Sequence, residues 1–367
     1  MEDFNKAFDY IIVGAGSAGC TLANRLTEDV SRTVLLLEAG GKDSNPWIHI
    51  PVGFVKTLDM PGLNWRFETE PEPNSKNRRI PIPRGRVLGG SSSINGMVYV
   101  RGQPLDYDTW SQLGNRGWSY ESVLPYFSKS ENYESSDEAW RGKNGELVTA
   151  EGREKAELLD VVLDAAEQCG YPKNADYNSG DQEGFGYFQV TQKNGRRWST
   201  AKAFLEPALK RPNLSLEINA HTTGILTDGG RATGVKFEQN GKTRTVTAAK
   251  GVVLCAGAVQ SPQILELSGI GNPNILRQYG IEVVHPLPGV GENYQDHYMV
   301  RQTWEIKKKI TLNEQTRGVS LIREALRYAF TRRGIMTYPA GILAGFVRTR
   351  PEIATPDVQY HIACLLY

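Results

Sequence analysis

The order of apolar and polar positions predicts a strand–helix–strand unit at the start of the chain. An apolar run ends at Val13, a small-residue segment follows over 14–19, and a helix is predicted over about 17–28. The next run, Val34-Leu-Leu-Leu37, is apolar at every position, which is typical of a parallel strand buried on both faces. We therefore expect a β-α-β unit over roughly residues 8–40.

A second pattern, over residues 214–255, alternates short apolar runs with turn signals. Asp228-Gly229-Gly230 and Asn240-Gly241 are hairpin signals between apolar runs. The strands expected from this pattern lie at 214–219, 224–227, 235–238, 243–249 and 252–255. We expect a β-meander inserted into a parallel-sheet protein. Its last run, Gly251–Gly257, is apolar and ends in small residues, so it is expected to be a central parallel strand.

The remaining segments combine one long irregular stretch with further helices. Residues 40–86 are rich in Pro, Gly and Asn and too long for a simple connection, so we expect an excursion over a bound ligand. Helices are predicted near 91–98, over about 120–131 and between 153 and 169, where Gly170 and Pro172 supply stop signals.

Composition restricts the classes of protein that the pattern allows. A chain of 367 residues can hold two domains, and a net charge of +1 gives no strong field for nucleic acid. The four cysteines show no Cys-x-x-Cys or zinc spacing, so no metal site is expected. No signal-like segment begins the chain and no run of 18 apolar residues could span a membrane. We expect a cytoplasmic protein, with peripheral attachment to the inner membrane left open.

The turn after the first strand reads Gly14-Ala-Gly16-Ser-Ala-Gly19 and has a physical interpretation at each glycine. Gly14 allows a sharp turn, Gly16 lets the backbone approach a pyrophosphate, and Gly19 lets the helix pack close to the strand. Glu38 ends the second strand, where a carboxylate accepts hydrogen bonds from ribose hydroxyls. Strand, glycines, helix and acid in this order predict a dinucleotide site.

A second glycine segment, Gly89-Gly90 followed by Ser91, Ser92 and Ser93, precedes the helix predicted near 91–98. Its flexible backbone and several donors would suit a phosphate or an electron-rich ring edge. The alternative is a Gly/Ser loop that only caps a helix.

Four motifs, of which the Gly14–Gly19 turn is the first, carry a resemblance to a known family. Residues 85–102 resemble the first signature of the glucose–methanol–choline (GMC) oxidoreductases, and of choline dehydrogenases in particular. Residues 257–271 resemble the second signature, and 287–297 the segment that follows it. The resemblance covers essentially the whole chain.

The resemblance implies an α/β fold with two domains. One is an FAD-binding, Rossmann-like parallel sheet with an inserted β-meander, over residues 1–145 and 196–296. The other is an incomplete α+β substrate domain with an antiparallel sheet, over residues 146–195 and 297–367. The apolar end of the chain, without a stop signal, is expected to reflect truncation.

The same resemblance implies FAD and a set of residues that bind it. Gly14–Gly19 would meet the pyrophosphate, Glu38 the ribose, and the backbone around Thr222, at the end of a meander strand, the adenine. The implied cofactor-binding residues are Gly14, Gly16, Ser17, Ala18, Gly19, Glu38, Ala39, Val87, Gly90, Ser91, Asn95, Gly96, Met97, Val98 and Thr222. Some members attach FAD through a histidine at the position of Ile94, so FAD is expected to be dissociable here.

The implied reaction is oxidation of a primary alcohol to the aldehyde by hydride transfer to flavin N5, with choline the leading substrate. The base in this family is a histidine on a C-terminal segment, and none of the five histidines of this chain has that context. The catalytic residue is therefore unknown, and the electron acceptor (oxygen, a quinone or a carrier) stays open. The alternatives are a flavin-binding fragment without turnover, and a GMC-type oxidase or lyase that acts on another alcohol.

Overall fold

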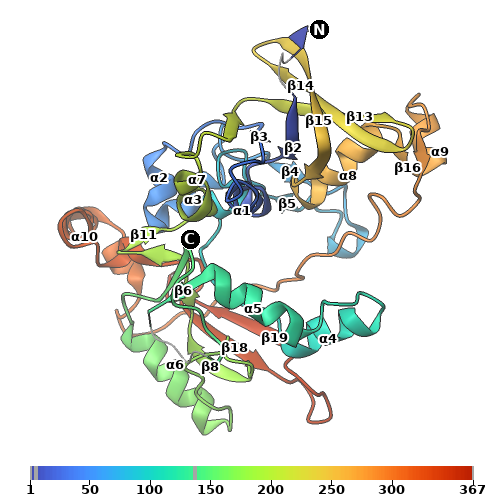
Figure 1. The fold of residues 1–367 in the computed structure, drawn as a ribbon. Coiled ribbons are helices and arrows are strands. Elements are labelled where there is room, and N and C mark those ends of the chain that lie inside the picture. The colour runs from blue at the N-terminus through green and yellow to red at the C-terminus, as the bar shows by residue number, and fades with distance from the viewer. Residues whose placement is uncertain (1, 4–6, 135–138, 366–367) are drawn as a thin grey trace. The chain divides into compact units, whose positions relative to one another are not determined.

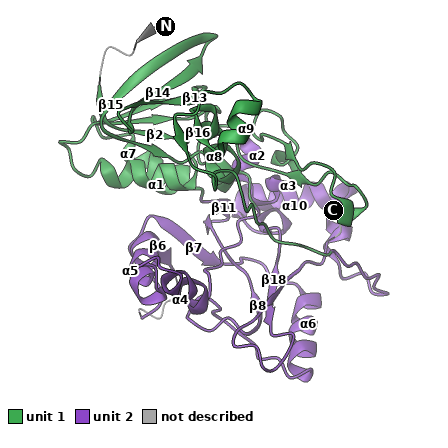
Figure 2. Ribbon diagram, turned by 90° about the vertical axis from the view of Figure 1, so that its right-hand side faces the viewer, with its two compact units in different colours: residues 1–45, 56–95, 199–300 green, residues 46–55, 96–198, 301–367 purple. Residues whose placement is uncertain are grey.

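The computed structural model describes residues 2–3, 7–134 and 139–365 (Figure 1). The chain divides into two compact units, each built from segments that alternate along the sequence (Figure 2). Unit 1 comprises residues 1–45, 56–95 and 199–300, and unit 2 comprises 46–55, 96–198 and 301–367. The segment boundaries expected at 145/146, 195/196 and 296/297 stay a prediction.

Unit 1 is organised around one seven-stranded sheet that is parallel on one side and antiparallel on the other. Its strand order is β12 (Leu214–Glu217), β3 (Val34–Leu37), β2 (Phe8–Val13), β15 (Lys242–Leu254), β14 (Arg231–Gln239) and β13 (His221–Asp228), with β1 (Glu2–Asp3) paired to β15. Strands β12, β3, β2 and β15 run parallel, and β15, β14 and β13 form an antiparallel meander. The predicted parallel sheet with an inserted meander is confirmed.

Strand β15 joins the two halves of this sheet. Its first part, 242–247, pairs antiparallel with β14. Its second part, 248–254, pairs parallel with β2, with an irregularity between Ala248 and Gly251. The two strands predicted at 243–249 and 252–255 are therefore one continuous strand. Its apolar end lies beside the first strand of the chain, as expected of a central parallel strand.

Two details of the predicted meander are wrong. The segment predicted at 214–219 is β12, which pairs in parallel with β3 and so belongs to the parallel half of the sheet. Asn213 fixes that position, because its side-chain amide donates to the carbonyls of Thr27, Asp29 and Arg32 in the turn before β3. Thr222 is the second residue of β13 and not the end of a strand.

The helix predicted near 91–98 is also wrong, because the structure has only a 3₁₀ turn, η3 (Gly90–Ser93). Gly89 and Gly90 have φ of +86° and +53°, outside the helical region. Ser92 Oγ donates to the Gly89 carbonyl and Ser93 Oγ to the Leu88 carbonyl. These local side-chain bonds compete with regular helix formation.

Helix α1 packs against the strand that precedes it. Its bounds are Ser17–Leu26, shorter than the predicted 17–28, and Cys20 and Ala23 are fully buried on it. The other elements of unit 1 are the second half of α3 (Phe54–Thr57), whose first two residues belong to unit 2, β4 (Phe67–Glu68), η2 (Pro73–Ser75), β5 (Pro81–Ile82), η4 (Ala201–Leu205), α7 (Glu206–Ala208), α8 (Gly257–Leu267), β16 (Ile270–Gly271), α9 (Pro273–Gln278) and β17 (His285–Pro286).

Unit 2 contains the antiparallel sheet that was expected of the second domain. Strand β18 (Leu343–Val347) pairs antiparallel with β19 (Val358–Ile362) and with β8 (Gly184–Tyr187). The predicted helices at 120–131 and 153–169 are α5 (Tyr120–Ser130) and α6 (Glu157–Gln168). The other elements are α2 (Pro46–His49), η1 (Pro51–Gly53), α4 (Pro104–Gln112), β6 (Glu131–Tyr133), β7 (Leu147–Glu151), β9 (Gln189–Val190), β10 (Gln192–Lys193), β11 (Arg196–Arg197), η5 (Leu312–Gln315), α10 (Gly318–Thr331) and η6 (Ile335–Thr337).

Among the residues that the structure describes, no helix has the length and apolar character needed to cross a bilayer.

The close packing of α1 on β2 gives a stability prediction. A Cβ at Gly19 would lie 1.9 Å from the Gly14 carbonyl oxygen, so Gly19→Ala forces the helix away from the turn. We expect a loss of about 1–3 kcal/mol in the free energy of unfolding, as for other overpacked sites. Urea unfolding followed by circular dichroism measures it. The control is Gly62→Ala, where nothing lies within 4 Å of the added Cβ. Equal stability of the two variants would contradict the packing described.

Candidate functional site

A cavity of about 460 Å³ lies in unit 1 at the carboxyl ends of its central parallel strands. Val13, Leu37 and Leu254, the last residues of β2, β3 and β15, all line it. Strands β3 and β15 flank β2 on opposite sides, so the chain order reverses at β2. In open α/β sheets, ligands bind in the crevice at such a reversal.

The glycine turn after β2 forms one wall of the cavity. Gly14 has φ of +98°, and a Cβ there would lie 2.5 Å from the Cys255 carbonyl oxygen. At Gly16 the nearest atom to a built Cβ is Gly90 Cα at 3.9 Å, so the space beside it is open. Gly14 therefore makes the turn and Gly16 leaves room for a ligand. Gly19 lies behind the turn, where it lets α1 pack close, as the sequence predicted.

Glu38 joins the turns that follow β2 and β3. Its carboxylate accepts hydrogen bonds of 2.8 Å from the Ala15 N–H and from the Gly40 N–H. The residue is 5% exposed, and burial raises its pKa against the opposing effect of these two bonds. Each carboxylate oxygen has a further lone pair for a ligand hydroxyl. The sequence predicts only a ligand contact for Glu38 and carries no signal for its bond to the Ala15 N–H.

Two helices begin at this cavity. Ser17 and Ala18 of α1, and Gly257, Ala258 and Val259 of α8, line it. Neither helix has a side-chain hydrogen bond at its N-cap residue. The first N–H groups of a helix and its dipole both favour an anion. Two such helix ends at one cavity suit a diphosphate, which carries two negatively charged groups.

Part of the cavity lining comes from the long excursion over residues 40–86. Trp65 and Arg84 line the cavity, and the Trp65 ring lies edge-on to the His221 ring at 5.6 Å. The Arg86 guanidinium lies 4.6 Å from the centroid of Trp65. The predicted site included neither Trp65 nor His221. The expectation that the excursion covers a ligand was the signal that could have suggested Trp65.

Thr222, which follows His221 in the sequence, also lines the cavity. It is 5% exposed, and its Oγ1 has no hydrogen-bond partner among the described residues. A buried hydroxyl without a partner is uncommon in a folded protein. It fits a wall that a polar ligand completes.

The predicted site residues fall into three groups. Those that line the cavity are Gly14, Gly16, Ser17, Ala18, Glu38, Ala39, Gly90, Ser91 and Thr222. Gly19, Val87 and Asn95 belong to unit 1 without lining the cavity, and Gly96, Met97 and Val98 belong to unit 2. Of the histidines, only His221 lines the cavity; His285 and His297 are exposed residues of unit 1, and His49 and His361 belong to unit 2.

A family model and curated proteins that resemble this chain agree on one family. The family model for GMC oxidoreductases matches residues 8–299. The oxygen-dependent choline dehydrogenase of Photobacterium profundum is 44% identical over 359 residues, which are 97% of this chain and 63% of that protein. That of Sinorhizobium medicae is 42% identical over 357 residues, 96% of this chain and 64% of that protein. The chain thus spans less than two thirds of the length of these curated relatives.

Solved structures agree with the fold. An FAD-dependent oxidoreductase from Chaetomium thermophilum superposes with a TM-score of 0.85 at 30% identity, covering 92% of this chain and 61% of that chain. The formate oxidase of Aspergillus oryzae RIB40, studied for modification of its FAD, gives a TM-score of 0.84 at 26% identity and covers 94% of this chain and 62% of that one.

The bonds of Glu38 predict how strongly the cavity depends on it. In Glu38→Gln, the side-chain amide can accept only one of the two N–H bonds, and in Glu38→Ala neither is made. An N–H left unsatisfied costs about 1–3 kcal/mol. We therefore expect the Kd for FAD to rise about tenfold or more in Glu38→Gln, and further in Glu38→Ala. Titration of flavin fluorescence measures this affinity.

The matched control is Glu238→Gln, which neutralises an exposed carboxylate on β14 of the same unit. It should leave the Kd unchanged. If Glu38→Gln binds FAD as tightly as the unaltered chain, the carboxylate does not shape the turn.

Proposed function

The chain belongs to the GMC oxidoreductase family, and on that premise we propose that it binds FAD in the cavity of unit 1 and oxidises a primary alcohol to the aldehyde. FAD is the cofactor of this family, and the fold is the one expected of it. The single observation that carries the proposal is the meeting of two uncapped helix N-termini and a glycine turn at one cavity.

The residues of the cavity fit the ADP half of FAD. The open space at Gly16 and the first N–H groups of α1 and α8 suit the pyrophosphate. The free lone pairs of Glu38 suit the ribose hydroxyls. We assign the adenine to the wall that holds Thr222, where Oγ1 lacks a partner. FAD, when bound, supplies the hydride acceptor for alcohol oxidation.

Six of the predicted residues between 87 and 98 are assigned to the flavin side by resemblance. They are Asn95, Gly96, Met97 and Val98, together with Val87 and Gly90. At the position where some members attach FAD covalently, this chain has Ile94, which is 1% exposed and chemically unable to form that bond. We therefore propose that the FAD is dissociable at this position.

Choline is the substrate that the comparisons favour. The curated relatives named above carry the name choline dehydrogenase and match 96–97% of this chain. The family also includes enzymes named for other substrates, such as the pyridoxine 4-oxidase and formate oxidases among the solved structures. We propose a choline-like primary alcohol as substrate and assign no general base to the described residues.

The cofactor proposal predicts the behaviour of a single variant. In Gly16→Val the side chain enters the space proposed for the pyrophosphate, while no other atom lies within 3.9 Å of its Cβ. The variant should fold and purify without flavin absorbance, whereas the unaltered chain purifies yellow. A folded Gly16→Val chain with full flavin content would contradict the assignment.

The substrate proposal is tested by anaerobic mixing of the flavin-loaded protein with choline and with a panel of other alcohols. Choline should bleach the flavin absorbance faster than any other member of the panel. Faster bleaching by another alcohol would show that this alcohol, and not choline, is the preferred substrate. Flavin that no alcohol bleaches would contradict the proposed activity and leave only the binding of FAD.

A further inference from the structure

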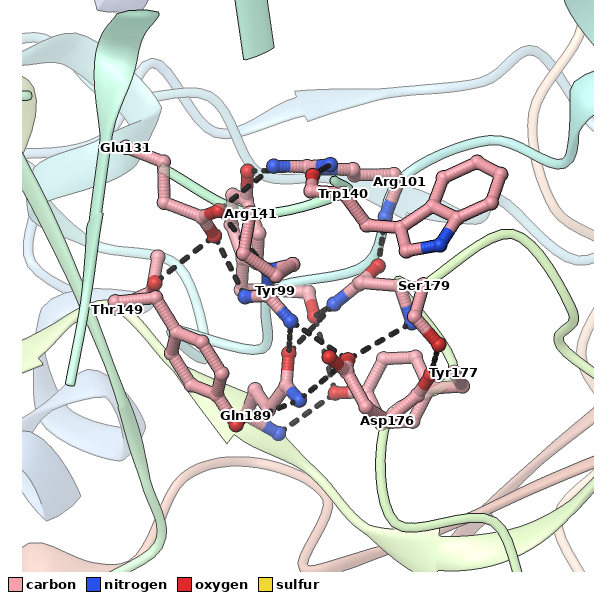
Figure 3. Close-up of polar contacts among 12 residues, drawn as sticks. Tyr99, Arg101, Glu131, Trp140, Arg141, Thr149, Asp176, Tyr177, Ser179 and Gln189 are labelled. Atoms are coloured by element: carbon pink, nitrogen blue, oxygen red, sulfur yellow. Dashed lines mark hydrogen bonds and ion pairs between the residues drawn. The ribbon is translucent and has the colours of Figure 1, made fainter. Parts of the chain in front are cut away.

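Unit 2 contains a charged cluster whose centre is buried and which the proposed reaction does not use. The side chains of Glu131 and Arg141 are 0% exposed and that of Arg101 is 1% exposed. Glu131 Oε2 accepts from Arg101 Nη2 at 2.7 Å, and Oε1 accepts from Arg141 Nη2 at 2.6 Å (Figure 3). Thr149 Oγ1 and the Gly142 N–H also donate to this carboxylate. Glu131 is therefore the centre of the cluster.

The cluster extends from Arg141 to a second carboxylate and an amide. Arg141 Nη1 donates to Asp176 Oδ1 at 2.6 Å and to Gln189 Oε1 at 2.9 Å (Figure 3). Asn178 Nδ2 donates to the same Gln189 oxygen at 2.7 Å. Buried ion pairs are often replaceable by apolar residues without loss of stability, so stability alone is a weak reason for this arrangement. A defined geometry is what such a network adds.

The geometry that the network defines is that of segment 96–101. The Arg101 side chain donates to Glu131, while the Arg101 N–H donates to Asn178 Oδ1 at 2.7 Å. The Tyr99 N–H donates to the Gln189 carbonyl at 2.8 Å, and the Tyr99 carbonyl accepts from Tyr177 Oη at 3.0 Å. The backbone of Tyr99 and the N–H of Arg101 are thus held by residues of the cluster or their neighbours.

The same segment contains a residue in an uncommon backbone conformation. Met97 has φ of +62°, in the left-handed region that a non-glycine residue seldom adopts, and it is 1% exposed. The Thr191 N–H donates to the Met97 carbonyl at 2.9 Å, and the Ala340 N–H donates to the Gly96 carbonyl at 3.1 Å. Such conformations persist where the surroundings over-determine them, and they gather at functional sites.

We propose that Glu131 is a positioning residue, which through Arg101 and Arg141 fixes the backbone of segment 96–101 in the conformation that the flavin requires. The inference rests on the proposed function, because Gly96, Met97 and Val98 belong to the residues assigned there to the flavin side. Glu131 acts through the segment and not on the flavin itself. Its carboxylate holds one end of the segment while Met97 keeps its left-handed conformation at the other.

The experiment compares Glu131→Gln with Glu324→Gln in the full chain. Glu324 is a matched control, since it is also a buried carboxylate of unit 2, is 3% exposed, and accepts from the Ile335 N–H just after α10. Two properties are measured: hydrogen exchange of the backbone amides of 96–101 without FAD, and the visible absorbance and circular dichroism of bound FAD. If Glu131→Gln fails to fold, the same two measurements are made on Arg101→Lys. This variant keeps the positive charge and removes the planar guanidinium.

We expect exchange in 96–101 to be at least about tenfold faster in Glu131→Gln, because local opening becomes easier when the network is broken. Its flavin bands should shift and its flavin circular dichroism should change. Glu324→Gln should lower the melting temperature without either effect. This difference separates positioning from a general loss of stability.

Each other outcome overturns a defined part of the inference. Unchanged exchange in 96–101 overturns the claim that the cluster fixes the segment. Faster exchange with an unchanged flavin spectrum overturns the claim that the flavin requires that conformation. An unaltered chain that binds no FAD overturns the proposed function and the flavin part of the inference with it, while the exchange result still decides whether Glu131 orders the segment.

Discussion

The candidate site depends on the pair of hydrogen bonds that the Glu38 carboxylate accepts. One comes from the Ala15 N–H in the glycine turn after β2, and the other from the Gly40 N–H after β3. Because β2 and β3 are neighbouring parallel strands, their turns lie at the same edge of the sheet, and one buried carboxylate reaches both. A backbone N–H bond to an ionised acceptor is among the stronger hydrogen bonds in proteins. With the turn held in this way, Gly16 stays beside open space.

The topology of the sheet then supplies the rest of the cavity. Strand β15 lies on the other side of β2 and leads directly into α8, as β2 leads into α1. Two helix N-termini therefore reach one cavity from adjacent strands, and neither has a side-chain cap. Such a site favours a diphosphate by geometry and by charge. In unit 2, Glu131 and its two arginines order segment 96–101 by side-chain hydrogen bonds, whereas in unit 1 a regular sheet orders the site.

Sequence reasoning succeeded where the signal is local. The apolar runs of β2, β3 and β15, and the glycines of the first turn, follow from strand burial and backbone conformation alone. It failed where a contact joins distant segments. The pairing of β12 with β3 depends on Asn213. The part of the cavity lined by Trp65 and His221 depends on the path of the long segment 40–86. The prediction of a helix near 91–98 is wrong for another reason. Two glycines with positive φ and two serine side chains favour a turn over a regular helix.

We have proposed that the cavity of unit 1 holds the ADP half of FAD. Isothermal titration of the flavin-free chain with ADP, followed by FAD, tests it most directly, because ADP carries the diphosphate, ribose and adenine without the flavin. We expect ADP to bind at one site and to compete with FAD. Two results would contradict this expectation: saturating ADP that leaves FAD binding unchanged, or a chain that binds riboflavin phosphate but not ADP. In either case the cavity does not hold the ADP half of FAD.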